Sequence, residues 1–276
     1  MAAPLGHDRV GTGPPLLLIH PLGADRHVWD QVAERLAPTR EVISLDLPGF
    51  GTSQPLREEP TPAALAAAVA EFTDSLGVTR PDVAGNSLGG WVALELALAG
   101  HAASVTAIAP AGLWSRPLGQ KRALARTLSR LGLPLVSTAT ATARGRRLLL
   151  AGSVARPELV GPAAAARLIR SYATAPDFTR VNAAMRSAMF TRLAEVEVPV
   201  TLVWPEFDGL VRRPRRLPPT VVSIDLPGAG HIPMLDQPDA VVAILERSAA
   251  GQDPGDRSSM LYRLSSPAKG VIDADV

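Results

Sequence analysis

The sequence predicts an α/β protein in which helices flank a mostly parallel central sheet. Short apolar or β-branched runs, each closed by Gly, Pro or Asp, alternate with segments whose apolar residues recur at helical spacing. With 276 residues, 46% of them apolar, the chain is long enough to bury a substantial core. Strands and helices that alternate in this way are typical of a parallel sheet covered on both faces.

Six runs have the character of buried parallel strands, because they are continuously apolar rather than alternating. In chain order they are PPLLLIHPLG, EVISLDLPGFG, PDVAGNS, SVTAIAPAG, PVTLVWPEFD and VVSIDLPGAGH. Helical patterns occupy residues 27–37, 61–76, 88–100 and 237–249. We therefore expect the α/β core to be formed by residues 1–112 and 193–250.

Residues 113–192 interrupt this alternation and predict an all-helical insert. Strand patterns vanish there, and Leu124, Leu128 and Leu131 recur at helical spacing. From Gly112 to Arg192 the sequence has 14 basic and 2 acidic residues. Such a block favours anionic ligands or an acidic surface, unless its arginines simply coat the solvent faces of helices. Because no aromatic interleaving accompanies the arginines, we expect no nucleic-acid partner.

The two ends of the chain and its composition exclude several classes of protein. The opening MAAPLGHDRVG has no cationic region followed by an apolar stretch, and no apolar run approaches the roughly 18 residues of a membrane span. The chain has no cysteine. We expect a cytoplasmic protein with no disulfide, no metal or other cofactor and no stable membrane insertion. Residues 251–276 are expected to form a disordered tail. Alternatively, Leu261, Tyr262 and Leu264 dock on the body of the protein or on a second copy.

The stretch VAGNSLGGWVALELA places a serine where an apolar run becomes a helical pattern. Its residues Gly85-Asn86-Ser87-Leu88-Gly89 fit G-x-S-x-G, in which a serine sits on a sharp strand-to-helix turn with its oxygen above the sheet. The flanking glycines allow a tight bend, and the following helix N-terminus provides N–H groups and a positive dipole end. We predict that Ser87 is a nucleophile.

A serine nucleophile needs a base, and His231 is the histidine best placed for that role. It closes the final predicted strand at the carboxyl edge of the sheet, where ligands of open α/β folds bind. His7, His27 and His101 occupy positions typical of surface residues. His20 lies in the exit turn of the first long strand, near the site but wrongly placed for a base.

The base in turn needs a carboxylate, and the reacting carbonyl needs hydrogen-bond donors. Asp208 follows the preceding strand and lies 23 residues before His231, while Glu206 is a neighbouring alternative. The backbone N–H of Leu88, directly after the serine, and that of Leu22, in the HPLG turn, are the expected donors of an oxyanion hole.

These segments together resemble the α/β-hydrolase fold superfamily, and in particular serine hydrolases with a helical cap. The matching stretches are LLLIHPLGADRHVWDQVAERL, VISLDLPGFGTS, VAGNSLGGWVALELA, VPVTLVWPEFDGLV and LPGAGHIPMLDQPDAV. The resemblance implies a catalytic triad of Ser87, Asp208 and His231, an oxyanion hole from Leu22 and Leu88, and a cap at 113–192. One departure is the proline-rich VRRPRRLPP, which cannot easily form the helix that normally follows the acid and predicts a reshaped loop.

The resemblance implies hydrolysis of a carboxylic ester, or a similar acyl bond, of a small molecule through an acyl-enzyme. The arginines of the cap would suit an anionic substrate. The alternatives are a carbon–carbon bond hydrolase of the aromatic-degradation type, an acyltransferase or perhydrolase that uses the same triad, and a ligand receptor with low turnover. The expected pocket walls are Leu113, Trp114, Tyr172, Phe178, Met185 and Met189.

Overall fold

The computed structural model describes residues 4–119 and 124–249 and confirms the predicted fold class. Within these residues one sheet contains seven strands in the order β1-β3-β2-β4-β5-β6-β7. The strands are β1 (His7–Val10), β2 (Pro15–Ile19), β3 (Glu41–Leu45), β4 (Asp82–Asn86), β5 (Ser104–Ile108), β6 (Val200–Pro205) and β7 (Val221–Leu226). Only β1 runs antiparallel to its neighbour, and the other pairs are parallel.

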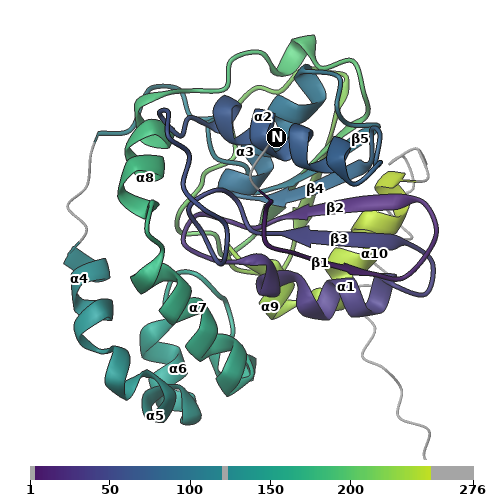
Figure 1. Cartoon of the computed structure of the whole chain (residues 1–276). Coiled ribbons are helices and arrows are strands. Elements are labelled where there is room, and N and C mark those ends of the chain that lie inside the picture. The colour runs from purple at the N-terminus through teal and green to yellow at the C-terminus, as the bar shows by residue number, and fades with distance from the viewer. Residues whose placement is uncertain (1–3, 120–123, 250–276) are drawn as a thin grey trace, which may run out of the picture.

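Helices cover both faces of the sheet (Figure 1). On one face α2 (Pro62–Ser75) packs on α3 (Leu88–Leu98), and on the other α1 (Asp30–Leu36) packs on α10 (Pro238–Ala249). A short helix α9 (Pro233–Asp236) and the 3₁₀ turns η1 (Arg26–Trp29) and η4 (Leu193–Glu195) complete the core. The central strands are apolar on both sides because both faces are covered; β6, for example, is buried throughout.

The parallel register gathers the carboxyl ends of the strands at one edge of the sheet. Ile19, at the end of β2, pairs with Gly85, and Asn86, at the end of β4, pairs with Ile108. At the end of β6, Pro205 pairs with Leu226. Residues that follow these strands therefore meet at the same edge, although they are far apart in the sequence.

A run of short helices lies between β5 and β6, and we refer to residues 113–192 as the helical insert. Its elements are α4 (Leu124–Leu131), η2 (Leu133–Leu135), α5 (Val136–Ala141), α6 (Ala143–Leu149), η3 (Pro157–Leu159), α7 (Pro162–Thr174) and α8 (Phe178–Ser187). Its described part contains no strand. Figure 1 shows α4, α5 and α6 at the end of the molecule that lies away from the sheet, with α7 and α8 closer to it.

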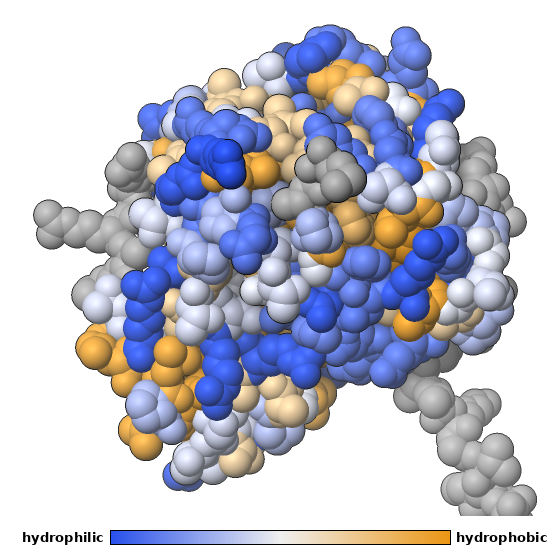
Figure 2. Space-filling view, in the orientation of Figure 1, coloured by the Kyte–Doolittle hydropathy of each residue, from blue (hydrophilic) through white to orange (hydrophobic). Residues whose placement is uncertain are grey.

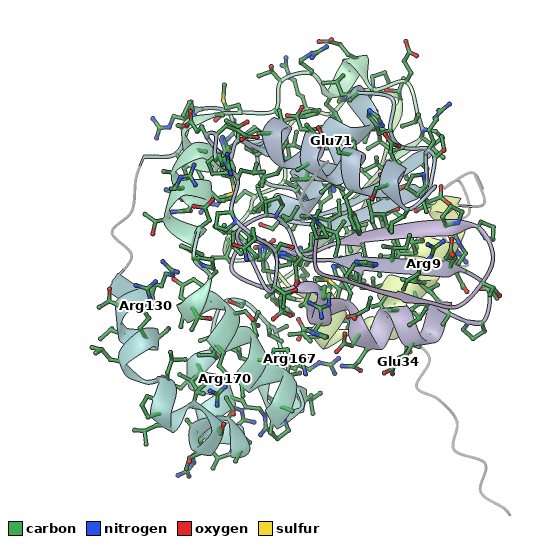
Figure 3. The ribbon with its side chains drawn as sticks, viewed as in Figure 1. Arg9, Glu34, Glu71, Arg130, Arg167 and Arg170 are labelled. Carbon is green, nitrogen blue, oxygen red and sulfur yellow. The ribbon has the colours of Figure 1, made fainter. Side chains whose placement is uncertain are left out.

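The insert is joined to the core by apolar and charged contacts. Phe178, Val181 and Met185 belong to the same buried cluster as residues of α2 and α3, whereas Ile169 belongs to the cluster on the opposite face of the sheet. Arg167, on the side of α7 that faces the core (Figure 3), lies 3.5 Å from the carboxylate of Asp30.

Two features of the core were not predicted from the sequence. The edge strand β1 is largely exposed and lacks an apolar pattern, so only its pairing with β3 reveals it. The other is helix α9, which is a single turn.

The predicted tail at 251–276 lies outside the described residues. Within the described residues, no helix has the length and apolar character needed to cross a membrane.

A buried carboxylate ties three segments together near the carboxyl edge of the sheet. Asp46, which follows β3, is fully buried. Its Oδ1 accepts a hydrogen bond from the backbone N–H of Arg26 at 2.8 Å. Its Oδ2 accepts from the Arg26 guanidinium at 2.6 Å and from the backbone N–H of Thr52 at 2.9 Å. Burial raises the pKa of Asp46, but these hydrogen bonds and nearby charges outweigh it and lower that pKa below its ordinary value.

We expect Asp46→Asn to reduce the free energy of unfolding at pH 7 by about 2–4 kcal/mol, because it breaks a buried ion pair. Since the pKa of Asp46 is depressed in the folded state, its stabilisation is present above its unfolded pKa of about 3.9 and is lost as the pH falls through the folded value. Denaturant unfolding at neutral and acid pH should therefore show the difference from the wild type shrinking below about pH 4. Asp74→Asn, at an exposed position of α2, is the matched control. Equal losses from both variants at pH 7 would contradict this role.

Candidate active site

Ser87 occupies the sharp turn between β4 and α3. Its backbone has φ 55° and ψ −112°. Residues other than glycine rarely adopt this conformation, which costs on the order of 1–3 kcal/mol. The hydroxyl makes no capping hydrogen bond to α3, although Ser87 is the residue directly before the helix. The serine therefore does not act as a helix cap, and the strained turn holds its side chain above the sheet edge.

The glycines of this turn are needed because the backbone approaches itself and its neighbours closely. A Cβ atom on Gly85 would lie 2.1 Å from the carbonyl oxygen of Gly89. A Cβ on Gly89 would lie 2.3 Å from the carbonyl oxygen of Ile19, at the end of β2. Neither glycine has a positive φ, so the strained conformation falls on Ser87 itself. The glycines thus allow the first turn of α3 to sit directly against the neighbouring strands.

His231 and Asp208 form a buried hydrogen-bonded pair on the loops that follow β7 and β6. The Nδ1–H of His231 donates to Asp208 Oδ2 at 2.8 Å. Asp208 Oδ1 accepts from the backbone N–H groups of Leu210 at 2.7 Å and Val211 at 3.0 Å. Burial raises the pKa of Asp208, but the hydrogen bond and charge of His231 and the two N–H groups together lower it. The carboxylate therefore stays ionised and is suited to orient the imidazole through its Nδ1–H.

Glu206, the alternative acid, lies elsewhere. It is exposed, and its carboxylate accepts a hydrogen bond from the backbone N–H of Gly228 at 2.8 Å. The loop from Glu206 to Thr220 contains no helix, in agreement with its proline-rich sequence. Of the two carboxylates, only Asp208 contacts His231 among the described residues.

Asn86 links the loop of the histidine to the turn of the serine. Its side chain is fully buried, and its Nδ2 donates to the carbonyl of His231 at 3.0 Å and to that of Ile108 at 3.1 Å. The residue next to Ser87 therefore holds the backbone of His231 against the ends of β4 and β5. Among the described residues the structure gives no direct hydrogen bond between the Ser87 hydroxyl and His231, and such contacts often tighten only when a substrate binds. Asn86 was not among the predicted site residues, and its place directly before Ser87 is the signal that the sequence carries.

The expected oxyanion donors belong to the serine turn and to the turn after β2, whose first residues pack against Gly89. Leu88 begins α3, and Leu22 lies in the turn that follows β2. Neither backbone N–H donates a hydrogen bond elsewhere in the described chain. Backbone N–H groups that make no turn hydrogen bond at such positions are suited to bind a negatively charged oxygen.

His20 fixes the turn that carries Leu22. It is fully buried, its Nε2 accepts from the backbone N–H of Leu47 at 3.0 Å, and its Nδ1–H donates to the carbonyl of Pro21 at 2.8 Å. Burial is the largest influence on the pKa of His20 and lowers it, so the ring is neutral with both nitrogens in use. This positioning role was not predicted. The signal for this role in the sequence is the position of His20 directly after the first long predicted strand.

The predicted wall residues fall into two groups. Tyr172 and Phe178 pack edge to face and lie over the turn after β2, because a Cβ on Gly23 would lie 2.9 Å from the Tyr172 ring and 3.1 Å from that of Phe178. Trp114 instead packs on Trp91 of α3 and donates from its indole to the Ala188 carbonyl.

The remaining predicted wall residues are Leu113, Met185 and Met189. Leu113 packs partly buried against the core, Met185 is buried within it, and Met189 is half-buried. Tyr172 and Phe178 thus lie over the turn that carries Leu22. Met185 belongs to the buried cluster that contains Leu88, and Leu113 and Trp114 pack against that cluster, as Leu22 does.

The predicted nucleophile and base are almost closed off from solvent. Ser87 is 7% exposed and His231 4%. A surface cleft of about 520 Å³ reaches Asp208 and is bordered by Trp204 and Arg213. A second cleft, of about 240 Å³, lies between Asp25 and Arg167. Ser87 lines neither of these two clefts.

This chain is similar to a family of hydrolases and to several individual members with known names or structures. The model of the alpha/beta hydrolase family matches residues 16–244. Epoxide hydrolase EphH of Mycobacterium tuberculosis is 31% identical over 201 residues, which are 66% of this chain and 92% of that protein. Pimeloyl-[acyl-carrier protein] methyl ester esterase of Vibrio vulnificus is 39% identical over 101 residues, which are 36% of each chain. An esterase structure from Thermogutta terrifontis, at 23% identity and a TM-score of 0.67, covers 90% of this chain and 93% of its own.

Some curated relatives are much longer than the matching segment. In two of them the segment that matches this chain covers 28% and 30% of the relative, respectively, which is less than a third of each relative's length.

We expect Asp208→Asn to lower kcat for a p-nitrophenyl ester by about 10⁴-fold, because an amide at this position no longer fixes the imidazole tautomer. Glu206→Gln should change kcat by less than about twofold, since the Glu206 side chain contacts only a turn N–H. Steady-state kinetics of the two variants, with circular dichroism to check folding, makes the comparison. A large loss in Glu206→Gln with none in Asp208→Asn would assign the acid to Glu206.

We expect Asn86→Ala to lower kcat by about 10- to 100-fold, because it releases the His231 carbonyl from the serine turn and removes its buried hydrogen-bond donor at a cost of about 1–3 kcal/mol. Kinetics and thermal unfolding should be measured together, with Asn182→Ala in α8 as the matched control. A positioning role predicts that kcat falls much more than KM rises. A fall in melting temperature with unchanged kcat would limit Asn86 to a role in stability.

Proposed function

Because this chain belongs to the alpha/beta hydrolase family, we propose that it is a serine hydrolase that cleaves a carboxylic ester, or a similar acyl bond, of a small molecule. The observation that carries the proposal is the buried hydrogen bond between His231 and Asp208, held by Asn86 beside the strained turn of Ser87. The proposal assigns Ser87 as nucleophile, His231 as base and Asp208 as the acid that orients it.

The proposed reaction has two half-steps. In the first, His231 Nε2 accepts the proton of the Ser87 hydroxyl while its oxygen attacks the ester carbonyl, and the backbone N–H groups of Leu22 and Leu88 bind the negative charge on the carbonyl oxygen. The protonated imidazole then returns that proton to the leaving alcohol, which leaves an acyl-serine. In the second half-step, His231 takes a proton from water as the water attacks the acyl group. His231 then gives this proton to the oxygen of Ser87 as the bond between that oxygen and the acyl group breaks, which releases the carboxylic acid.

The serine favours ester cleavage over the activity that the name of one relative suggests. EphH of M. tuberculosis is called an epoxide hydrolase. A carboxylate that opens an epoxide forms an ester, which water can then hydrolyse. A serine that opened an epoxide would form an ether, which has no carbonyl for water to attack. Ser87 is therefore chemically suited to acyl transfer, in line with the ester named for the V. vulnificus relative.

The proposal does not require a charged substrate. Several arginines of the helical insert donate to backbone carbonyls rather than standing free, namely Arg126, Arg130, Arg146, Arg180 and Arg186. The aromatic pair Tyr172–Phe178 above the Leu22 turn would instead present an apolar surface to the acyl group. The proposed substrate is thus a small ester whose acyl side is apolar.

We expect Ser87→Ala to lower the rate of p-nitrophenyl butyrate hydrolysis by about 10⁴- to 10⁶-fold and to abolish labelling by a fluorophosphonate, because no nucleophilic oxygen remains. Intact-mass spectrometry of the wild type should show one phosphonyl adduct on Ser87. Ser187→Ala at the end of α8 is the matched control and should keep both properties. Undiminished labelling of Ser87→Ala would place the nucleophile elsewhere.

A further inference from the structure

The helical insert presents an unusual number of exposed leucines. Among the described residues nine large apolar side chains are exposed, and six of them are leucines of residues 124–160. They are Leu128, Leu131, Leu135, Leu148, Leu149 and Leu159, with 38% to 79% of each side chain exposed. Scattered single leucines are normal on a protein surface, but a concentration of this kind in one segment marks an interaction surface.

Helix α4 exposes leucines and buries an arginine, which is the reverse of an ordinary surface helix. An ordinary surface helix buries its leucines and exposes its arginines. In α4, Arg126 is only 5% exposed, whereas Leu128 and Leu131 are 59% and 75% exposed. Leu135, on the following 3₁₀ turn, continues the same line at a spacing of four residues and is 69% exposed. The apolar side of this segment is therefore the side that faces solvent.

The inversion is held in place by hydrogen bonds to the end of α7. Arg126 donates to the carbonyls of Tyr172 and Ala175 and lies over the Phe178 ring at 4.9 Å. Arg130 donates to the carbonyl of Ala173 at 2.7 Å. These carbonyls lie at or just after the last turn of α7, which leaves main-chain acceptors without partners and favours a positive charge. Rotation of α4 to bury its leucines would break all of these bonds.

Arginines accompany the exposed leucines of this segment, although Arg126 itself is buried. Residues 124–160 contain six arginines and one acidic residue, Glu158. Arg144 and Arg156 are exposed and make no ion pair within the described chain. Figure 2 shows an apolar patch over the outer end of the insert, and Arg130 and Arg170, labelled in Figure 3, lie beside it. Leucines interspersed with guanidinium groups match the chemistry of an anionic lipid surface, in which phosphates lie above acyl chains.

We propose that this face of the helical insert, residues 124–160, docks on an anionic lipid surface. The leucines of α4 and η2 enter the boundary between headgroups and acyl chains, and the arginines contact lipid phosphates. None of the six leucines lines either of the two clefts described above, and the exposed leucines together with the exposed Arg144 and Arg156 suit a lipid surface that carries both acyl chains and phosphates. Docking of this kind lays short helices on the bilayer and needs no helix that crosses it. The inference stands whether or not Ser87 is the nucleophile.

The test is vesicle flotation of the whole protein. We expect the wild type to float with vesicles of phosphatidylcholine and phosphatidylglycerol, to bind pure phosphatidylcholine about tenfold more weakly, and to lose affinity as the ionic strength rises from about 0.05 M to about 0.5 M. Leu128→Ser/Leu131→Ser/Leu135→Ser should bind the mixed vesicles at least about tenfold more weakly with an unchanged melting temperature, because these side chains are exposed in the free protein.

Two further variants test the contribution of the arginine charges and whether any exposed leucine would have the same effect. Arg144→Gln/Arg156→Gln should weaken binding to the mixed vesicles and leave binding to phosphatidylcholine unchanged. Leu210→Ser removes an equally exposed leucine outside the insert and should bind as the wild type does. Failure of the wild type to float with either vesicle would overturn the proposal. It would also be overturned if the triple variant bound as the wild type, or if light scattering showed a dimer that the triple variant dissolves while vesicles bind neither protein.

Discussion

The close approach of the turn around Ser87 to the ends of the neighbouring strands is the constraint on which the site depends. Gly89 lies against the carbonyl of Ile19, and Gly85 lies against Gly89. The N–H of Ser87 donates to the Ile108 carbonyl at 2.9 Å, and the Ser87 carbonyl accepts from Ala111 at 2.9 Å. Main-chain contacts to β2 and β5 therefore over-determine the strained backbone, as a residue with a positive φ requires.

Buried polar side chains transmit this constraint to the surrounding loops. Asn86 reaches the backbone of His231, His20 holds the turn of Leu22 against Leu47, and Asp46 ties Arg26 to Thr52. Each bonds to main-chain groups, so each fixes the path of a loop rather than only another side chain. Such groups are costly to bury without partners, and each loop is held because displacing it would leave one of them unpaired.

The helical insert shows how a charge count differs from a charge distribution. Its arginines give a strongly positive sequence, yet Arg126 is buried, and both Arg126 and Arg130 donate to carbonyls of the α7 terminus. Guanidinium groups suit this role because their several N–H donors can satisfy the carbonyls at a helix end. The leucines left outside are thus a consequence of how α4 is anchored, and the insert combines a polar attachment with an apolar outer surface.

The sequence by itself determined the α/β class, the order of the parallel strands along the chain and the strand–serine–helix turn. These features are local: apolar periodicity, glycine spacing and proline content act within a few residues of one another. The sequence also predicted that the loop after Asp208 would lack a helix, because proline excludes one. The edge strand β1 escaped prediction because its pattern is polar and only its partner β3 defines it.

Tertiary structure decided which distant groups meet. Asp208 and Glu206 are two residues apart, and it is the folded arrangement of the loops after β6 and β7 that brings Asp208, rather than Glu206, against His231. The roles of Asn86 and His20 and the inversion of α4 likewise depend on contacts between segments far apart in the chain, which composition and spacing do not encode. A residue type limits which bonds a side chain can make, but the packing of the fold selects the partner that satisfies them.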